Sequence, residues 1–482
     1  MIILVSSKIT QSTIQSSLGK PEYSYFFLLK EFLPVLKRIG EVITVTLDQV
    51  DTLYHQYREQ GQQVIFLSIS PPQQTPVDLE CPTICLFAWE FENLPSFSWD
   101  EEPRNDWRYV FERIEGGICT SRQTRDLVEQ MLPEFPVACI PAPVWNHYAQ
   151  LGDEQGHLPQ LEPRFFSFTG SLIDSLVLNP DPNGLVAPVS LDSPPPPQRL
   201  RLSSRLGSAL PEQIRQAWIV TKLAWNQWRK AMSRPASQAL PAEPRQMLGI
   251  ISTETPINLQ LKGVVYTTML SPADGRKNWV EIVAAFGWAF RNCAEATLVI
   301  KMTHYDLEFY YPDLVTLLSR MAPFKCRILV LHGYLEEGQY LELIRASTYY
   351  VNASAGEGLC LPLLEFLSAG CPVLAPTHTA MADYMDDKIG FPLQCAAEPY
   401  FWPHNPNGVY QTYRYRLNWQ SLVEAYRASF AQAVSAPEKY RTMSRKALVR
   451  MRDFASEERV EAQLREQINR VLEQAGSAEV AP

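Results

Sequence analysis

The stretch NASAGEGLCLPLLEFLSAGCPVLA, residues 352–375, decides the fold of this chain of 482 residues. It begins as a loop in which Gly356 and Gly358 have no side chain and therefore allow another group to approach the backbone closely. An apolar helix is predicted over 361–369, with a proline near its start and a glycine after its end, as is typical of helix boundaries. A short buried strand is predicted over 372–375. A loop, helix and strand in this order form a unit of an α/β sheet.

Short apolar runs alternate with amphipathic segments on both sides of this stretch. In the C-terminal half we predict strands over 264–268, 296–301, 327–331 and 349–352, and helices over 279–290, 313–322 and 337–346. In the N-terminal half we predict strands over 1–6, 42–47, 64–68, 83–87, 117–120 and 137–140, with helices over 25–36 and 121–132. Apolar strands separated by helices predict parallel sheets covered on both faces.

The predicted fold class is therefore α/β, with two doubly wound, Rossmann-like domains that face each other across a cleft. A segment of different composition separates them, because 16 of the 38 prolines of the chain fall in residues 141–260. We expect four parts: an N-terminal Rossmann-like domain over 1–150, a proline-rich and partly helical insertion over 151–260, a C-terminal Rossmann-like domain over 261–430, and C-terminal helices over 431–482 that cross back to the first domain.

Two carboxylates eight positions apart are the candidate chemistry of the stretch: Glu357 lies in the loop and Glu365 in the first turns of the helix. The backbone amides of Leu359 and Cys360 precede the helix, whose positive dipole end favours an anion such as a phosphate. Glu365 could bind sugar or ribose hydroxyl groups on the same side. The alternative is a glycine loop followed by a helix with an incidental buried glutamate.

With its surroundings EGxxLPLLExxxxGxPV, this stretch resembles the E-x7-E signature of retaining glycosyltransferases with the GT-B fold, particularly family 4. The segment TTMLSPADGRKNWVEIVAAF, residues 267–286, resembles the phosphate-contacting segment of the same family. The resemblance implies that Arg276 and Lys277 stabilise the departing diphosphate, that Glu357 orients the transferred sugar and that Glu365 holds the nucleotide ribose. No carboxylate is an evident nucleophile, so we expect same-face displacement, with a leaving phosphate oxygen as the base.

The resemblance adds further candidates with fewer matching neighbours. Lys301 ends a strand where such proteins place nucleotide-contacting loops, although a lysine at a strand end is also commonly just exposed. Trp89 and Glu90, in LFAWEFENLP, would lie on the acceptor side, and the alternative is that they only close the domain surface. Gly19, in the loop after the first strand, would allow a phosphate or acceptor to approach.

The composition excludes several classes of partner. With 43 basic and 52 acidic residues the net charge is -9, which argues against nucleic acid as a partner. The chain contains no D-x-D triplet, the paired carboxylates with which other glycosyltransferases hold a divalent ion, so we expect no metal or other cofactor. The N-terminus lacks a basic region followed by a long apolar core, and no run of 18 apolar residues occurs, so we expect a cytoplasmic protein.

The insertion carries a signal of its own over residues 199–234, where eight basic residues accompany one acidic residue. A helix predicted over 211–233 places Trp218, Trp225 and Trp228 on one face, which makes it a basic amphipathic helix. Such a helix could rest on the anionic inner face of a membrane as a peripheral contact, or grip an acceptor. The alternative is that its aromatic face packs on the protein's own domains.

These patterns lead to one functional expectation and two alternatives. We expect a retaining, metal-independent, hexosyltransferase-like enzyme that moves a sugar from a UDP- or GDP-sugar to a hydroxyl of a glycan, a lipid-linked or a small-molecule acceptor, in polysaccharide or glycoconjugate synthesis. One alternative is a GT-B sugar-nucleotide epimerase or phosphorylase. The other is a catalytically silent scaffold that binds nucleotide sugars or glycans.

Overall fold

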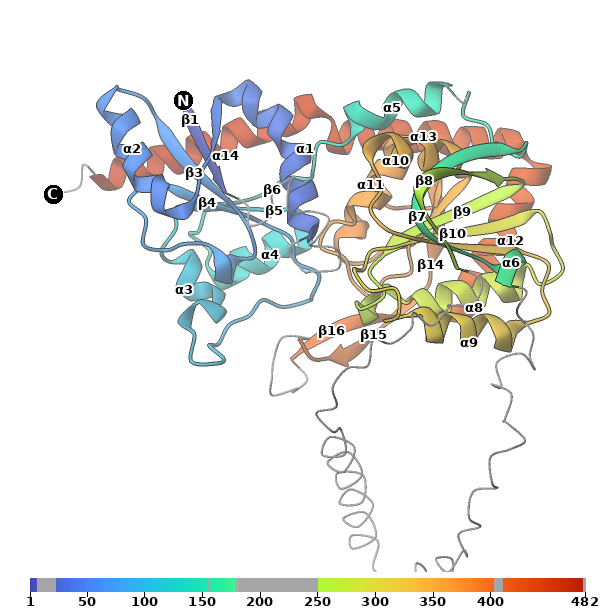
Figure 1. Ribbon diagram of the computed structural model, residues 1–482. Coiled ribbons are helices and arrows are strands. Elements are labelled where there is room, and N and C mark those ends of the chain that lie inside the picture. The colour runs from blue at the N-terminus through green and yellow to red at the C-terminus, as the bar shows by residue number, and fades with distance from the viewer. Residues whose placement is uncertain (7–22, 155, 179, 181–249, 403–410, 480–482) are drawn as a thin grey trace, which may run out of the picture. The chain divides into compact units, whose positions relative to one another are not determined.

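The computed structural model describes residues 1–6, 23–154, 156–178, 180, 250–402 and 411–479 (Figure 1). Residues Met1–Pro182 and Gly249–Pro482 form one compact unit. Gly19 and the expected helix over 211–233, with the basic segment 199–234, lie outside the described residues.

The first sheet has six parallel strands in the order β2-β1-β3-β4-β5-β6. The strands are β1 (Ile2–Ser6), β2 (Glu41–Thr44), β3 (Val64–Ile69), β4 (Thr83–Phe87), β5 (Gly116–Cys119) and β6 (Val137–Cys139), and the helices are α1 (Tyr23–Ile39), α2 (Val50–Glu59), α3 (Trp107–Phe111) and α4 (Arg122–Met131). All six residues of β3 and all five of β4 are buried, as expected of strands with helices on both faces. The strand expected over 42–47 ends at Thr44, because Thr46 and Gln49 form a capping box that starts a short 3-10 helix.

The second sheet has eight strands in the order β14-β13-β12-β9-β10-β11-β7-β8. Its parallel strands are β9 (Val264–Leu270), β10 (Ala296–Met302), β11 (Arg327–His332), β12 (Tyr349–Val351), β13 (Val373–Pro376) and β14 (Gly390–Leu393). The helices between them are α8 (Trp279–Ala289), α9 (Tyr311–Met321), α10 (Glu337–Ala346) and α11 (Leu361–Ser368), of which α8 and α9 pack side by side (Figure 1). From β9 the chain adds β10 and β11 on one side and β12 to β14 on the other, so the strand order reverses between β9 and β12. In open α/β sheets ligands bind at this reversal, outside the carboxyl ends of the strands.

Two strands of this sheet lie almost wholly in residues 151–260, where we expected a proline-rich and partly helical insertion and predicted no strand. β7 (Arg164–Asp174) pairs antiparallel with β11, and β8 (Ile250–Leu261) pairs antiparallel with β7 at the edge of the sheet. β7 buries Phe166 and Phe168 but leaves Phe165 66% exposed, a one-sided pattern unlike that of the central strands. Pro256 lies within β8, which an edge strand tolerates because one side of it needs no ladder hydrogen bonds.

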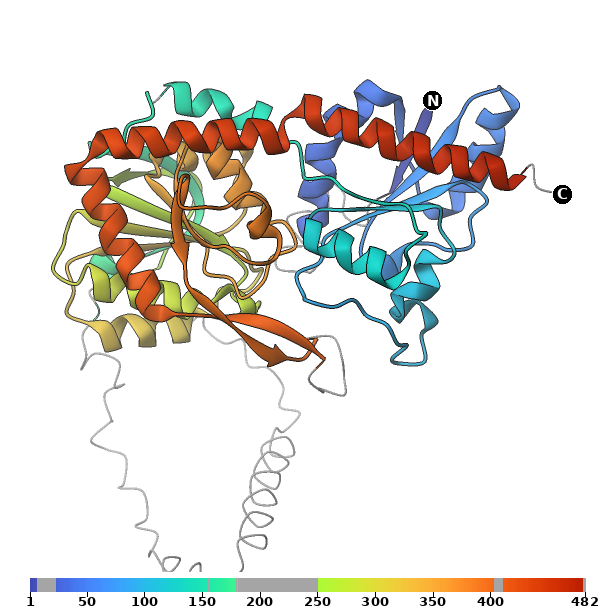
Figure 2. The ribbon, with the colours of Figure 1, turned by 180° about the vertical axis from the view of Figure 1, so that it is seen from behind.

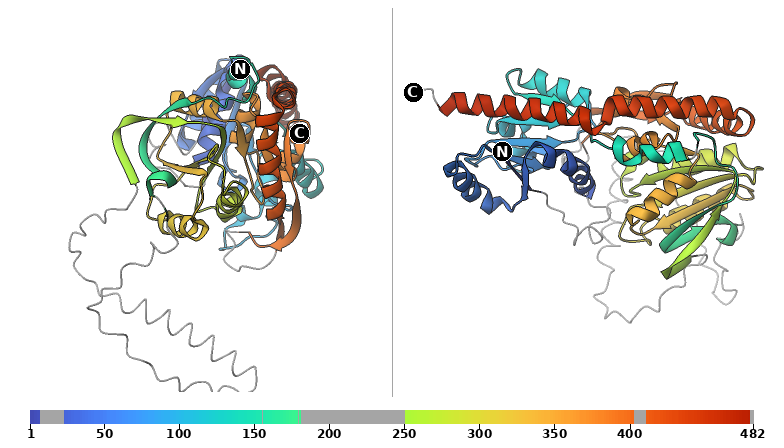
Figure 3. Two further views of the ribbon diagram at one scale, coloured as in Figure 1. Left: turned by 90° about the vertical axis from the view of Figure 1, so that its right-hand side faces the viewer. Right: turned by 90° about the horizontal axis from the view of Figure 1, so that it is seen from above.

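The chain ends in three helices, α12 (Trp419–Ser435), α13 (Pro437–Ala455) and α14 (Glu457–Glu479), drawn in orange to red (Figure 2). α12 packs on α8 of the second sheet, whereas α14 packs on α1 and β6 of the first (Figure 3). Nε2 of Gln467 in α14 donates to the carbonyl oxygens of Gly117, at 3.1 Å, and Pro136, at 2.7 Å. No helix among the described residues is both long and apolar enough to cross a bilayer.

Candidate functional site

Two loops flank the strand reversal of the second sheet, and their side chains meet. The loop after β9 contains a short 3-10 helix, Gly275–Lys277, and the loop after β12 contains Glu357. Nζ of Lys277 lies 2.6 Å from Oε1 of Glu357, and Nη1 of Arg276 lies 3.1 Å from its Oε2. The three residues expected to carry catalysis therefore form one cluster of charged side chains.

Hydrogen bonds to backbone carbonyl oxygens hold the two loops together next to this cluster. Asn278 takes a left-handed conformation with φ of 51°, which asparagine tolerates better than most residues, and its Nδ2 donates to the carbonyl oxygen of Ala353 at 2.7 Å. The backbone N–H of Ala355 donates to the carbonyl oxygen of Arg276 at 2.8 Å. The positions of Arg276 and Lys277 relative to Glu357 are thus fixed by main-chain as well as side-chain bonds.

The Glu357 carboxylate is buried but fully supplied with hydrogen-bond donors. Its side chain is 4% exposed, and Oε1 also accepts from Oγ of Ser354 at 2.5 Å and from Nδ2 of Asn352 at 3.1 Å. Burial alone would raise the pKa of Glu357, but Lys277 and Arg276 outweigh it and hold that pKa below its usual range. Glu357 is therefore ionised at neutral pH.

The loop after β4 of the first sheet supplies a further carboxylate. Oε1 of Glu90 lies 3.2 Å from Nε of Arg276, and Oδ2 of Asp274 lies 3.1 Å from the same nitrogen. Burial would lower the pKa of Arg276, but Glu90, Glu357 and Asp274 together hold it above its usual value. Burial also raises the pKa of Glu90, which Arg276 only partly offsets. Arg276 thus forms ion pairs with carboxylates from loops of both sheets.

The two glycines of the Glu357 loop are needed for contact with the protein's own backbone. A Cβ atom on Gly356 would lie 2.8 Å from the carbonyl oxygen of Glu90, and one on Gly358 would lie 2.8 Å from the amide nitrogen of Trp89. Oγ1 of Thr120 donates to the carbonyl oxygen of Gly358 at 2.6 Å. The groups that approach these two glycines closely thus belong to the loops after β4 and β5 of the first sheet, which pack directly on the Glu357 loop.

Leu359 and Cys360, whose amides we expected at an anion-favouring helix start, are only 6% and 8% exposed as whole residues. Cys360 precedes α11 with φ of 62°, and its Sγ lies 2.9 Å from Nδ2 of Asn352. Burial raises the pKa of the Cys360 thiol, so it stays neutral. The start of α11 is therefore a buried neighbour of the charged cluster.

Glu365 has a different set of neighbours from Glu357. It is 5% exposed, and it accepts hydrogen bonds from the hydroxyls of Tyr340 in α10 and Tyr148 in α5 (Trp145–Glu154). Burial raises the pKa of Glu365 to about 7, and these hydroxyls limit the rise. The structure therefore does not bring Glu365 into hydrogen-bond contact with Arg276, Lys277 or Glu357.

Lys301 and Trp89 also lie outside the charged cluster. Lys301 is 2% exposed at the end of β10, where Nζ donates to Oγ1 of Thr303 at 2.9 Å and burial lowers its pKa to about 7. It is thus not the exposed strand-end lysine of the alternative interpretation. Trp89 donates from Nε1 to the carbonyl oxygen of Asn93 and packs on Trp107 with ring centroids 4.6 Å apart, so its indole closes the surface of its own domain.

Among solved structures, sucrose-phosphate synthase from Thermosynechococcus elongatus is similar to this chain with a TM-score of 0.50 and 11% sequence identity, covering 98% of this chain and 100% of that one. The chain has the GT-B fold. This confirms the predicted fold class. Anabaena HepE, solved in complex with UDP and glucose, has a TM-score of 0.49 and 11% identity over 97% of this chain and 99% of that one.

The match found by sequence comparison covers a much smaller part of this GT-B chain than the structural matches do. The "Putative glycosyltransferase ORF313" of Acidianus filamentous virus 1 is 34% identical over 64 residues, which are 13% of this chain. The match spans 20% of that curated relative's length. No protein-family model matches the chain.

Three residues next to the charged cluster were not predicted from the sequence. Oγ1 of Thr379 accepts a hydrogen bond from the backbone N–H of Glu357 at 3.0 Å. The ring of His378 stacks on Tyr415, with centroids 4.1 Å apart and planes 9° apart, and the Tyr415 hydroxyl donates to Oε1 of Glu92 at 2.5 Å. The sequence feature that could have indicated Thr379 and His378 is the polar run after β13. Polar residues that follow a buried parallel strand lie at its carboxyl end.

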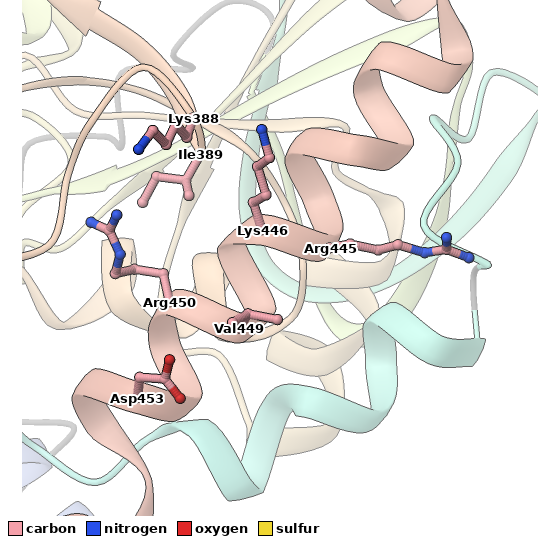
Figure 4. Close-up of a pocket in the computed structure, with 7 residues that line it drawn as sticks. All are labelled: Lys388, Ile389, Arg445, Lys446, Val449, Arg450 and Asp453. Carbon is pink, nitrogen blue, oxygen red and sulfur yellow. The ribbon is translucent and has the colours of Figure 1, made fainter.

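A cavity of about 340 Å³ lies elsewhere on the GT-B fold, next to α13. Its lining residues are Lys388, Ile389, Arg445, Lys446, Val449, Arg450 and Asp453 (Figure 4). The guanidinium of Arg445 points away from those of its neighbours, and Arg450 is bonded to the carbonyl oxygen of Tyr384 and to Asp386. The cations of this lining therefore do not all face one point.

Proposed function

We propose that this protein is a glycosyltransferase that moves a sugar from a UDP- or GDP-sugar to an acceptor hydroxyl with retention of configuration. The observation that carries the proposal is the contact of Arg276 and Lys277 with Glu357 at the strand reversal of the second sheet. This is where open α/β sheets bind ligands, and the GT-B fold is shared with a sucrose-phosphate synthase.

The charges of the cluster suit departure of a nucleoside diphosphate. Negative charge builds on the diphosphate as its bond to the sugar breaks, and two fixed cations stabilise that charge. Arg276 and Lys277 already hold carboxylate oxygens at 2.6 to 3.1 Å, the distance at which they would hold phosphate oxygens. They supply the positive charge, so the proposal needs no metal or other cofactor.

Glu357 would orient the transferred sugar. A carboxylate that is ionised at neutral pH accepts hydrogen bonds and donates none, so it suits sugar hydroxyls. No carboxylate of the cluster is needed as a nucleophile, because a leaving phosphate oxygen can take the proton of the acceptor hydroxyl on the same face. This route gives a product with retained configuration.

The remaining roles follow the family resemblance. Glu365 would hold the nucleotide ribose in exchange for the hydroxyls of Tyr340 and Tyr148, and Lys301 and the Leu359 and Cys360 amides would serve the donor. Glu90 would face the acceptor, which we expect to be a glycan, a lipid-linked or a small-molecule hydroxyl. We further propose that the protein works in the cytoplasm, with a peripheral contact to the inner membrane face through 199–234.

The direct test measures binding of UDP and GDP by calorimetry and nucleotide release from UDP-glucose, UDP-N-acetylglucosamine and GDP-mannose. Lys277→Met should lower nucleotide release by about 100-fold or more, the order of magnitude for loss of one charge-stabilising group. The matched control is Lys262→Met, because Lys262 is an exposed lysine of the same domain. Equal rates for the two variants would remove Lys277 from the mechanism, and a wild-type protein that binds neither nucleotide would overturn the donor site.

A further inference from the structure

His378 lies behind the Glu357 loop, two residues after β13 ends. It is 8% exposed, and its ring is held flat against Tyr415 with centroids 4.1 Å apart. Tyr415 is fixed in turn by its hydroxyl bond to Glu92 and by a backbone bond from its N–H to the carbonyl oxygen of Ala355 at 2.9 Å. The plane of the imidazole is therefore set by its surroundings.

The neighbouring hydroxyl of Thr379 sets the tautomer of this imidazole. Oγ1 of Thr379 accepts from the Glu357 N–H at 3.0 Å and donates its single hydrogen to the carbonyl oxygen of His378 at 2.8 Å. The same oxygen lies 3.4 Å from Nδ1 of His378. With the hydroxyl hydrogen donated to that carbonyl oxygen, we assign the hydrogen of the Nδ1 contact to the imidazole. Nε2 of His378 is then an acceptor.

That acceptor has no partner among the described residues, although the atom is buried. Buried polar atoms are nearly always hydrogen-bonded, so an exception needs an explanation. Burial lowers the pKa of His378 to about 4, partly offset by Glu357, so the ring is neutral at pH 7 and Nε2 keeps its lone pair. A hydroxyl group is the kind of donor that would form the missing hydrogen bond to Nε2.

The backbone around His378 is strained in a way that ties it to Glu357. Thr379 has φ of 51°, a left-handed conformation that a β-branched residue rarely adopts. The backbone N–H of Ala380 donates to the carbonyl oxygen of Glu357 at 3.1 Å, next to the Thr379 bond. Strain of this kind persists where the surroundings enforce it, and it clusters at functional sites. The distance between His378 and Glu357 is thereby fixed.

We propose that Nε2 of His378 accepts a hydrogen bond from a hydroxyl of the sugar that Glu357 holds, which makes His378 a specificity-determining residue. This inference rests on the proposed function. A lone ring packed for stability would need neither a fixed tautomer nor a strained neighbour.

The test compares two variants on the nucleotide sugar that the wild-type protein consumes fastest among UDP-glucose, UDP-N-acetylglucosamine and GDP-mannose. His378→Phe keeps the stacked ring but has no acceptor, and it should lower kcat/KM about ten-fold, the effect of one lost hydrogen bond. His378→Gln places an amide oxygen close to the position of Nε2 and should recover part of that loss. Thermal unfolding of both variants separates this loss from misfolding.

Deoxy analogues of the same donor identify the hydroxyl. On the analogue that lacks the partner hydroxyl, His378→Phe and the wild-type protein should have equal kcat/KM, whereas the ten-fold difference should persist on the others. If His378→Phe does not fold, the same series with His378→Leu, which also has no acceptor, makes the comparison. Equal activity of the variants and wild type on every donor would overturn this inference, as would an equal loss on every analogue. A wild-type protein that neither binds nor consumes any donor overturns the proposed function as well.

Discussion

The ammonium group of Lys277 lies 2.6 Å from Oε1 of Glu357, although the two residues are 80 positions apart in the chain. The contact joins the loops on either side of the strand reversal, and Arg276 extends it to Glu90 of the first sheet. One buried carboxylate therefore holds both cations that the proposed reaction needs. The first prediction concerns that carboxylate.

Glu357→Gln keeps the shape of the side chain and removes its charge. Donor turnover should fall by about 100-fold or more, because a neutral amide orients the sugar poorly and donates where the carboxylate accepts. UDP lacks the transferred sugar that Glu357 would orient, so the affinity for UDP should be unchanged or higher. Calorimetry with UDP and a nucleotide-release assay make the comparison, and loss of UDP binding in a folded variant would contradict the assigned role.

The stability of the ion pairs should depend on pH in a defined direction. The pKa of Glu357 is depressed in the folded state, so its contribution is complete above the ordinary value of 4.5 and is lost as the pH falls below it. Glu357→Gln should therefore cost about 3 kcal/mol of unfolding free energy at pH 7 and less near pH 3. Urea unfolding at both pH values tests this, with exposed Glu134→Gln as the control. A cost that does not change with pH would contradict the depressed pKa.

Glu365 should show the opposite pH dependence. Burial raises its pKa to about 7 from 4.5, so ionisation destabilises the folded state, and stability is lost as the pH rises through that window. Glu365→Gln should match the wild-type protein in unfolding free energy near pH 4.5 and exceed it by about 2 kcal/mol at pH 8. Denaturant unfolding at these two pH values measures the difference in unfolding free energy. A variant less stable than wild type at pH 8 would refute the prediction.

Gly358 should resist substitution because of what lies beside it. A Cβ atom there would meet the amide nitrogen of Trp89 at 2.8 Å and Cβ of Ala88 at 2.9 Å. Gly358→Ala should lower the unfolding free energy by about 1 to 3 kcal/mol. Gly338 in α10 has nothing within 4 Å of its Cβ position, so Gly338→Ala should raise stability slightly. Thermal unfolding of both variants checks the contrast, and a neutral Gly358→Ala would show that the loop is not tightly packed.

The parallel strands were predictable because burial on both faces leaves a continuous apolar run. The strand over 83–87 matches the structure at both ends for this reason, and the helix over 337–346 also matches at both ends. The antiparallel strands β7 and β8, of which β8 lies at the edge of the sheet, were not predicted, since one face of β7 is partly exposed and prolines occur beside or within both strands. Edge strands carry a weaker apolar signal than central ones.

The site was predictable only where residue type reveals chemistry. Arg276, Lys277 and Glu357 stand in loops after parallel strands, and the sheet order brings those loops together. The surroundings of Glu365 were not predictable, because Tyr340 and Tyr148 reach it from helices far away in the chain. His378 was missed because an isolated histidine has no spacing pattern, and its stacking on Tyr415 depends on a hairpin formed by β15 (Cys395–Tyr400) and β16 (Thr412–Leu417).

The proposed mechanism transfers a sugar from a nucleotide donor with retention of configuration at the Arg276, Lys277 and Glu357 cluster. Proton NMR of the anomeric signals, recorded while the protein consumes a UDP- or GDP-sugar, follows the donor and the first-formed product together. We expect the product to appear with the anomeric configuration of the donor, and not to appear with Lys277→Met. A first-formed product of inverted configuration, or no consumption of any donor by the wild-type protein, would contradict the account.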